Sequence, residues 1–337
     1  MPPIERTRRV AIADFSKGLR QISNPLALPA GFATDMNNVD VHNTPVLSTR
    51  RGVAAFDVDP ANEAAGLFQF RTQGGLYMLL KALGSTGDIL RYDGVTPWVS
   101  IGNMTPTLPV YGVSMPSKDW IIFGDGLLMK KYDGTTFADL GGAPPKLRHL
   151  EVHLSKLWGT EGYNTIRYSV TGNPEDWTTV DDAGEEVLDN PEGDPITAMK
   201  SHRDALFVWT RGAMYVVLGD DPFNFTIKPI ADADGCYSHF SVAEVDGFLY
   251  WFGPEGISRY YYGAKAQVIS RDWIDSIIAD SDVNEHSKVS AGTDGVRYYL
   301  SLPGVTIDRE IVFDPRYRAF LPREGQSYHR YLHWRMP

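Results

Sequence analysis

Residues 90–102 read LRYDGVTPWVSIG, and a similar stretch, MKKYDGTTFADLG, follows at residues 129–141. Both stretches contain a basic residue, the tripeptide Tyr-Asp-Gly, a threonine, an aromatic residue and a final glycine. The Asp-Gly pair is typical of a tight turn, because glycine adopts positive φ without a steric penalty. The flanking aromatic residues favour strands that pair across such a turn. Each stretch therefore predicts a β-hairpin, and a repeat of about forty residues is typical of a β-propeller.

The same plan, an apolar strand, a glycine-containing turn and an aromatic-bearing strand, recurs through the rest of the chain. In each of the six units, the second strand of this recognisable pair carries an aromatic residue. These residues are Tyr92, Tyr132, Tyr168, Tyr215, Tyr260 and Phe313. They lie between 36 and 53 residues apart, a spacing that brackets a four-stranded blade. We therefore predict an all-β fold, a six-bladed β-propeller over residues 53–337. The units diverge in sequence, which leaves five or seven blades open.

Residues 1–52 lack this repeat, and their proline and glycine content argues against one long helix. We expect an extended N-terminal arm with short strands. Its apolar residues have no partner in the repeat, and we expect them to dock on another subunit or ring component. These residues are Phe15, Leu19, Leu26, Leu28 and Phe32. Packing of the arm on its own domain is the alternative.

One segment, residues 267–285, breaks the strand pattern. Its residues Trp273, Ile274, Ile277 and Ile278 share one helical face. The segment predicts one short helix, with Ser270 as the N-cap and Asp272 in the first turn. We expect this helix to pack on its own blade, and packing on a partner is the alternative.

Composition excludes several classes of protein. The formal net charge of −10 weighs against tight nucleic-acid binding, which depends on Lys and Arg neutralising phosphates. A single cysteine, Cys236, rules out an internal disulfide. No apolar stretch approaches the length that spans a membrane, so we expect no membrane span.

Four acidic residues gather in one glycine-containing loop, Asp181, Asp182, Glu185 and Glu186. A solvated outer loop is the first reading of this cluster, and a cation site or the lining of a channel are the alternatives. A second acidic segment, 232–235, resembles part of a calcium loop but lacks the distal glutamate, which favours a plain turn.

The aromatic C-terminal tail, with Tyr328, Tyr331 and Trp334, is expected to pack on a neighbour rather than to bind metal. The turn at residues 169–177 invites comparison with sialidases, which are also propellers. An aspartate expected two residues after the serine is replaced here by Thr171. We expect no catalytic residue, metal or cofactor, and a sialidase-like or glycan-binding propeller remains the alternative reading.

Two groups of motifs resemble proteins of tailed bacteriophages. The N-terminal group, which resembles the opening of many phage virion proteins, consists of Phe15, Gly18-Leu19, residues 28–33, Asn38-Val39 and residues 50–52. The second group, which resembles the tail and nozzle propellers of these phages, consists of Tyr168-Ser169 with residues 172–177, and residues 235–238 with residues 249–257.

The resemblance implies a structural protein of the virion tail, made in the host cytoplasm, without enzymatic activity. It implies a homo-oligomeric ring, for which we expect a hexamer although the sequence leaves the ring order open. The ring would contact a portal adaptor or other tail proteins and let genomic DNA pass without tight binding. A cellular interaction scaffold is a further alternative, and it would need no phage-like arm.

Overall fold

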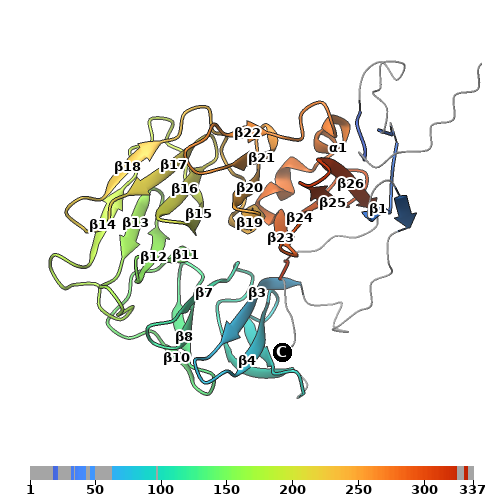
Figure 1. Cartoon of the computed structure of the whole chain (residues 1–337). Coiled ribbons are helices and arrows are strands. Elements are labelled where there is room, and N and C mark those ends of the chain that lie inside the picture. The colour runs from blue at the N-terminus through green and yellow to red at the C-terminus, as the bar shows by residue number, and fades with distance from the viewer. Residues whose placement is uncertain are drawn as a thin grey trace, which may run out of the picture.

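Six antiparallel sheets of four strands each lie around a common axis in the computed structural model (Figure 1). The structure describes residues 18–21, 32–33, 35–42, 46–49, 63–95, 98–324 and 330–332. Each sheet takes its four strands from one continuous segment, and strands that follow one another in sequence pair with each other. The predicted all-β, six-bladed β-propeller is confirmed.

The blades follow one another in chain order around the ring. Blade one consists of β3 (Ala64–Arg71), β4 (Tyr77–Leu83), β5 (Asp88–Tyr92) and β6 (Val99–Asn103). Blade two consists of β7 (Tyr111–Met115), β8 (Trp120–Gly124), β9 (Met129–Tyr132) and β10 (Phe137–Asp139). Blade three consists of β11 (Arg148–His153), β12 (Lys156–Glu161), β13 (Thr165–Tyr168) and β14 (Gly184–Val187). Blade four consists of β15 (Ile196–His202), β16 (Ala205–Thr210), β17 (Met214–Leu218) and β18 (Thr226–Pro229). Blade five consists of β19 (Ala243–Val245), β20 (Phe248–Gly253), β21 (Gly256–Tyr260) and β22 (Gln267–Val268). Blade six consists of β23 (Ser290–Thr293), β24 (Tyr298–Leu302), β25 (Arg309–Asp314) and β26 (Ala319–Glu324).

The first strand of each blade lies nearest the axis, where β3, β7, β11 and β15 contact one another in turn and β19 contacts β23. The second strands are almost entirely buried on both faces, because each blade packs between two others. All six residues of β16, for example, are buried. The six aromatic residues used to count the units all lie in third strands, so the repeat identified in the sequence is the third strand of every blade.

The second Tyr-Asp-Gly stretch forms the hairpin that its sequence predicts. Asp133 Oδ1 accepts hydrogen bonds from the backbone N–H groups of Thr135 and Thr136, at 2.8 and 2.7 Å. Gly134 has a φ of +99°, and Tyr132 pairs with Phe137 across the turn. The side chain of the aspartate therefore holds the turn, and the glycine supplies the left-handed backbone conformation.

The expected helix is present but shorter and later than predicted. α1 spans Asp275–Ala279, while residues 267–268 form β22. Ser270 is not the N-cap, because its Oγ accepts a hydrogen bond from the backbone N–H of Ile257 at 2.9 Å. Within the described part of the chain, two 3-10 helices accompany α1, namely η2 (His239–Ser241) and η3 (Val283–Lys288). Ile274 and Ile277 are buried in a core cluster that blades five and six share, so the helix packs within its own propeller.

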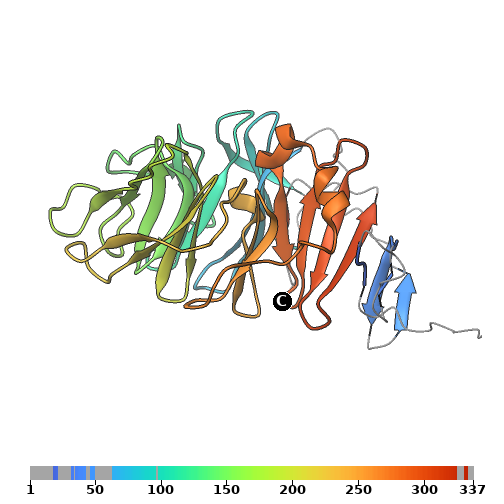
Figure 2. The same cartoon turned by 90° about the horizontal axis from the view of Figure 1, so that it is seen from above.

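The arm contributes a two-stranded hairpin, β1 (Val39–His42) and β2 (Val46–Thr49). This hairpin lies outside the ring, beside the outermost strand β26 (Figure 2). Blade one begins with β3 at Ala64, and the proposed boundary at residue 52 lies outside the described residues. None of the helices in the described part of the chain is long and apolar enough to cross a membrane.

Candidate functional site

The axis of the ring is filled by side chains from four separate parts of the chain. The rings of Tyr111 and Phe240 stack with centroids 5.1 Å apart and an interplanar angle of 8°. The His149 ring lies 4.9 Å from Tyr111 and 5.4 Å from the ring of His239. We call Tyr111, His149, His239, Phe240 and Arg330 the axial cluster. Since these side chains meet across the axis, the propeller itself does not supply a passage for a duplex.

Arg330 reaches this cluster from the C-terminal segment, residues 330–332. Its guanidinium carbon lies 3.5 Å from the centroid of the Phe240 ring, and its Nε donates to the carbonyl oxygen of Ala65 at 3.1 Å. Burial lowers the pKa of Arg330 to about 10. The hydroxyl of the adjacent Tyr331 donates to Glu310 at 3.0 Å. The segment thus joins blade one to blades five and six, and Tyr331, expected to pack on a neighbour, packs within its own chain.

Both histidines of the axial cluster are held neutral. Burial and the nearby Arg148 lower the pKa of His149 to about 3. Burial, together with His149, Lys200 and Arg330, lowers the pKa of His239 well below its usual value. His149 Nδ1 and Thr160 Oγ1 share a hydrogen bond of 2.8 Å. The cluster is therefore stable only while these rings carry no charge.

The neutral histidines predict a loss of stability in acid. Below the unfolded pKa of 6.5, the unfolded chain binds protons that the folded chain does not, so the free energy of unfolding falls as pH drops from 6.5 toward 3. For His149 the loss is about 1 kcal/mol between about pH 6.5 and 5.5, and His239 adds a loss of the same sign. His149→Asn suits the left-handed backbone at φ +48° and removes the titrating ring. Urea unfolding at both pH values should show about 1 kcal/mol less acid destabilisation in the variant, and an equal loss in both proteins would contradict this account.

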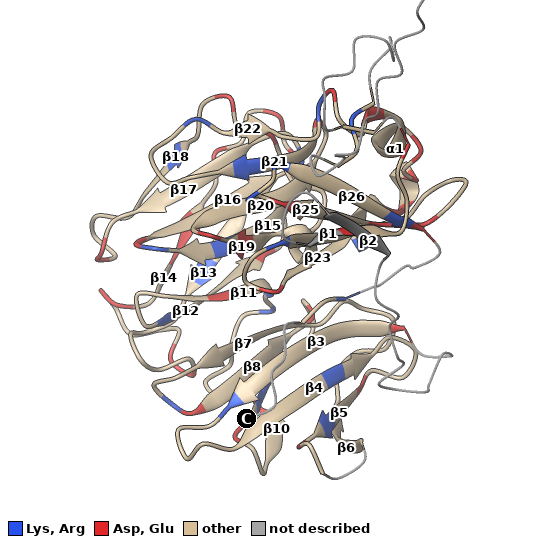
Figure 3. Ribbon diagram, turned by 45° about the vertical axis from the view of Figure 1, so that its right-hand side comes forward, with Lys and Arg blue, Asp and Glu red and all other residues tan. Residues whose placement is uncertain are grey.

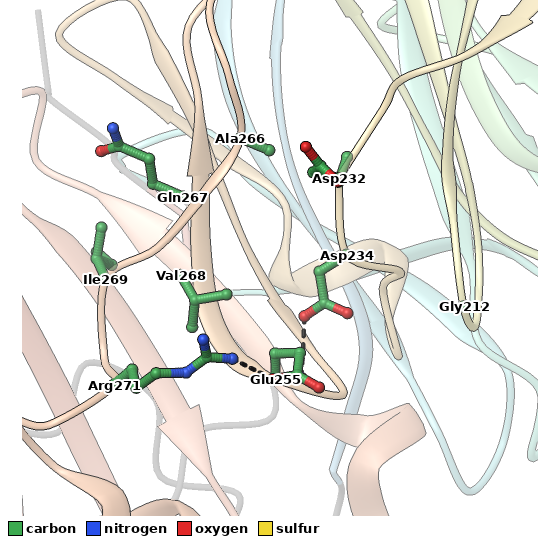
Figure 4. Close-up of a pocket in the computed structure, with 10 residues that line it drawn as sticks. Gly212, Asp232, Asp234, Glu255, Ala266, Gln267, Val268, Ile269 and Arg271 are labelled. Atoms are coloured by element: carbon green, nitrogen blue, oxygen red, sulfur yellow. Dashed lines mark hydrogen bonds and ion pairs between the residues drawn. The ribbon is translucent and has the colours of Figure 1, made fainter.

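A pocket of about 630 Å³ opens between blades four and five (Figure 4). Burial raises the pKa of Asp234 to about 6, and this carboxylate accepts a hydrogen bond from the backbone N–H of Glu255 at 3.0 Å. Glu255 also pairs with Arg271, and Lys265 pairs with Asp232 at 2.8 Å. The charged groups around the pocket are therefore engaged by one another or, for Asp234, by the backbone.

The two aspartates of the partial calcium motif lie in this pocket, but they bond to different partners. Asp232 is paired with a lysine, and Asp234 accepts from the backbone. A Cβ atom on Gly235 would lie 1.8 Å from the carbonyl oxygen of Arg211, so the glycine is required by close packing. Within the residues that the structure describes, no group of three or more metal-ligating side chains occurs. The two carboxylates of this segment are thus engaged by a lysine and by a backbone N–H group.

The four predicted acidic residues lie at the outer rim of blade three, on β14 and the loop before it, and not on the axis (acidic residues are red in Figure 3). Asp182 pairs with the buried Lys156. Glu185 pairs with Arg167 at 2.6 Å. Two of the four therefore have a structural partner within the blade. Their facing the lumen of a ring of subunits stays a prediction.

Two of the five arm residues lie in the described part of the chain, and both contact blade six. Leu19 is 2% exposed, and its backbone N–H donates to the carbonyl oxygen of Phe320 at 3.1 Å. The Phe32 ring lies edge-on to Trp273, with centroids 5.2 Å apart. Phe15, Leu26 and Leu28 fall outside the described residues. Docking on another subunit stays a prediction for these three residues.

An ion triad, which sequence reasoning missed, fastens the arm to the last blade. Arg323 of β26 donates to Asp40 of β1 at 2.7 Å and to Glu310 of β25 at 2.6 Å. All three residues are less than 10% exposed. The three residues lie far apart in the sequence, and arginine, aspartate and glutamate are common surface residues. No local sequence pattern therefore indicates that they meet.

The turn compared with sialidases has a structural role in blade three. Ser169 Oγ accepts from the backbone N–H of Leu157 at 3.0 Å, Trp177 Nε1 donates to the carbonyl oxygen of Pro174 at 2.9 Å, and Asp176 accepts from Thr178 and Thr179. The polar groups of this turn are thus used to hold its own conformation.

Comparison with known proteins supports the fold. No family model matches the chain, and no curated protein matches it. Virginiamycin B lyase from Staphylococcus aureus is similar in structure, with a TM-score of 0.54 and 11% identity over 79% of this chain and 86% of that one. The AfRom2 CNH domain is similar with a TM-score of 0.50 and 9% identity over 80% of this chain and 86% of that one. The two neighbours differ in kind, so the likeness shows the β-propeller and not a function.

Proposed function

We propose that the chain is a structural subunit of a phage tail, in which identical copies form a ring that continues the genome conduit. The observation that carries this proposal is the place of the phage-like N-terminal motif. Gly18 has a φ of +78° and lies against Ala319 and Phe320. Leu19 is buried beside them. Asn38 has a φ of +54° and donates its backbone N–H to the carbonyl oxygen of Pro322 at 3.1 Å. The motif residues thus fasten an arm to the outer side of the last blade.

This arrangement supports an architectural role rather than an enzymatic one. The arm adds a hairpin outside the ring of blades, where it extends the surface that a neighbouring subunit can contact. The axial cluster fills the propeller's own centre, so a conduit for DNA must lie between subunits. A closed ring of identical copies provides such a conduit and uses one heterologous contact repeated around the axis. Portal-adaptor and other tail proteins are the proposed neighbours above and below the ring, in the virion tail.

The proposal is tested by the assembly state of the full chain. Sedimentation should give a species of several subunits, and negative-stain images should show rings with a central opening. A hexamer is the expected order. A chain that stays monomeric at all concentrations and shows no rings would contradict the proposed assembly.

The conduit also predicts weak interaction with DNA. Lysine and arginine bind DNA phosphates because this binding releases the counterions condensed on the duplex. A wall along which the duplex slides should lack such binding, and the net charge of −10 opposes it. We expect no measurable binding of a labelled duplex in an anisotropy titration at physiological salt, where even non-specific binders reach about 10⁻⁴ to 10⁻⁶ M. Salt-sensitive micromolar binding would reveal a basic surface and would contradict passive passage.

A further inference from the structure

The charge of the chain is distributed unevenly. Residues 168–199 contain nine acidic residues and neither lysine nor arginine, against a net charge of −10 for the whole chain. The nine are Glu175, Asp176, Asp181, Asp182, Glu185, Glu186, Asp189, Glu192 and Asp194. Almost the entire excess of negative charge therefore lies in one segment, which forms the outer part of blade three and the connection to blade four.

A loop of blade four extends this acidic surface. The loop between β17 and β18 carries Asp220 and Asp221, and its Phe225 ring packs 5.3 Å from Tyr168 of blade three. Burial raises the pKa of Tyr168, and so do the nearby charges of Glu186, Asp221 and Glu185. The outer strand of blade three and this loop are therefore close neighbours, and their carboxylates act on the same hydroxyl.

Exposed apolar side chains lie among these charges. Val180 is 80% exposed, Val187 is 58% exposed and Phe223 is 77% exposed. Among the described residues, β14 pairs only with β13, so its outer edge offers unpaired backbone groups to another strand. We call residues 180–187 together with residues 220–223 the acidic rim. A free strand edge with apolar and acidic side chains is a surface that an extended basic segment fits.

The chain itself contains a segment with that chemistry. Residues 1–17, which lie outside the described residues, read MPPIERTRRVAIADFSK. They contain four basic residues, Arg6, Arg8, Arg9 and Lys17, against two acidic ones, Glu5 and Asp14. Three arginines lie directly before the apolar run of residues 10–12. The charge and the apolar content of this segment are thus complementary to those of the acidic rim.

The position of the arm favours a second copy as the owner of the rim that it binds. The residues that follow this segment, Gly18 and Leu19, are fixed on blade six. Blade three lies on the opposite side of a six-membered ring of blades (Figure 1). A segment of 17 residues spans at most about 60 Å when extended, which is enough to leave its own blade and reach an adjacent molecule. Contact between opposite sides of two copies is heterologous, and such contacts form a ring when the rotation from one copy to the next closes on itself.

We propose that residues 1–17 of one copy bind the acidic rim of the next, adding a strand to the edge of β14. The arginines lie against the rim carboxylates, and the apolar residues cover Val187 and Phe223. This inference rests on the proposed ring and names the contact that builds it.

Two variants with complementary defects test the contact. The first lacks residues 1–17 but keeps Gly18 and Leu19, and so retains the rim. The second carries Asp181→Asn, Glu186→Gln and Asp221→Asn, which weaken the rim and leave the arm intact. Each should remain monomeric alone, and a mixture should form a complex of one copy of each and nothing larger. Absence of this complex in sedimentation would overturn the inference.

A peptide titration supplies a matched control. Fluorescent peptide 1–17 should bind the truncated protein saturably, and the three rim substitutions should weaken binding at least tenfold. A control with the same change of charge, Asp139→Asn, Asp204→Asn and Asp246→Asn, alters acidic residues away from the rim and should change binding less than about twofold, since screened surface charges contribute little at a distance. Equal weakening by both sets would show non-specific attraction and overturn the inference.

The outcomes separate this contact from the proposed function. Rings formed equally well by the truncated protein would remove the arm contact and leave the ring proposal intact. Saturable binding of the peptide to the rim in a protein that never forms rings would support the contact and contradict the ring.

Discussion

Deletion of residues 1–45 is expected to leave a folded six-bladed propeller that no longer joins tail particles. The deletion removes the arm that the ring contact requires, while all 24 blade strands lie beyond it. It also uncovers the site of Leu19 in blade six, at a cost of about 1.5–3 kcal/mol for a buried leucine. Circular dichroism should remain dominated by strands, thermal unfolding should occur at a lower temperature, and sedimentation should show a monomer.

A single substitution in the full-length chain separates the anchoring of the arm from its presence. Gly18→Ala would place a Cβ atom 2.9 Å from both Ala319 Cβ and the Phe320 carbonyl oxygen, at a φ of +78°. We expect it to displace the arm from blade six and weaken assembly. Gly263→Ala is the matched control, because Gly263 also has positive φ, +81°, but has nothing within 4 Å of the added atom. Normal assembly of the protein that lacks residues 1–45 would contradict both predictions and show that the arm serves only internal packing.

The largest loss of stability is expected from Arg323→Ala. This change leaves the carboxylates of Asp40 and Glu310, which are 5% and 4% exposed, facing each other without their cation. Removal of one partner from a buried ionic group costs about 3–5 kcal/mol. Urea unfolding of the purified variant measures the cost directly.

Arg316→Ala is the control for this substitution. The Arg316 side chain is 53% exposed, and its partner Asp314 keeps a second cation, Arg297, at 2.8 Å. We expect a loss below about 1 kcal/mol, as for other exposed ion pairs. Since Asp40 belongs to the arm, Arg323→Ala should also cost less in the protein that lacks residues 1–45. A cost that is small, or that does not depend on the arm, would contradict the role of the triad.

The fold could be predicted from the sequence because a propeller repeats its local chemistry. Each unit places an aromatic residue in the third strand of its blade, and turns such as that at Asp133-Gly134 are specified by the residues they contain. The prediction of the helix was less accurate. Ser270 has the side chain of an N-cap, but its hydroxyl bonds to the neighbouring strand at Ile257, a tertiary contact that local pattern does not reveal.

The centre of the molecule could not be predicted. Tyr111, His239 and Arg330 come from blade two, the approach to blade five and the C-terminal segment, and more than ninety residues separate each from the next. Nothing in the sequence around any one of them indicates that their side chains meet. The acidic residues near 181–186 were identified from composition, but only the structure shows that they lie on an outer strand and that Lys156 and Arg167 engage two of them.

The continuity of the blades has a consequence for the order of events during synthesis. Because each blade is one uninterrupted segment, its contacts are local and it can form as soon as its four strands have left the ribosome. Blade one is complete at Asn103, yet its contact with the last blade depends on residues 330–332. The nascent chain therefore grows as an open arc with an uncovered face at each end, and the arc closes only after residues 330–332 have been synthesised.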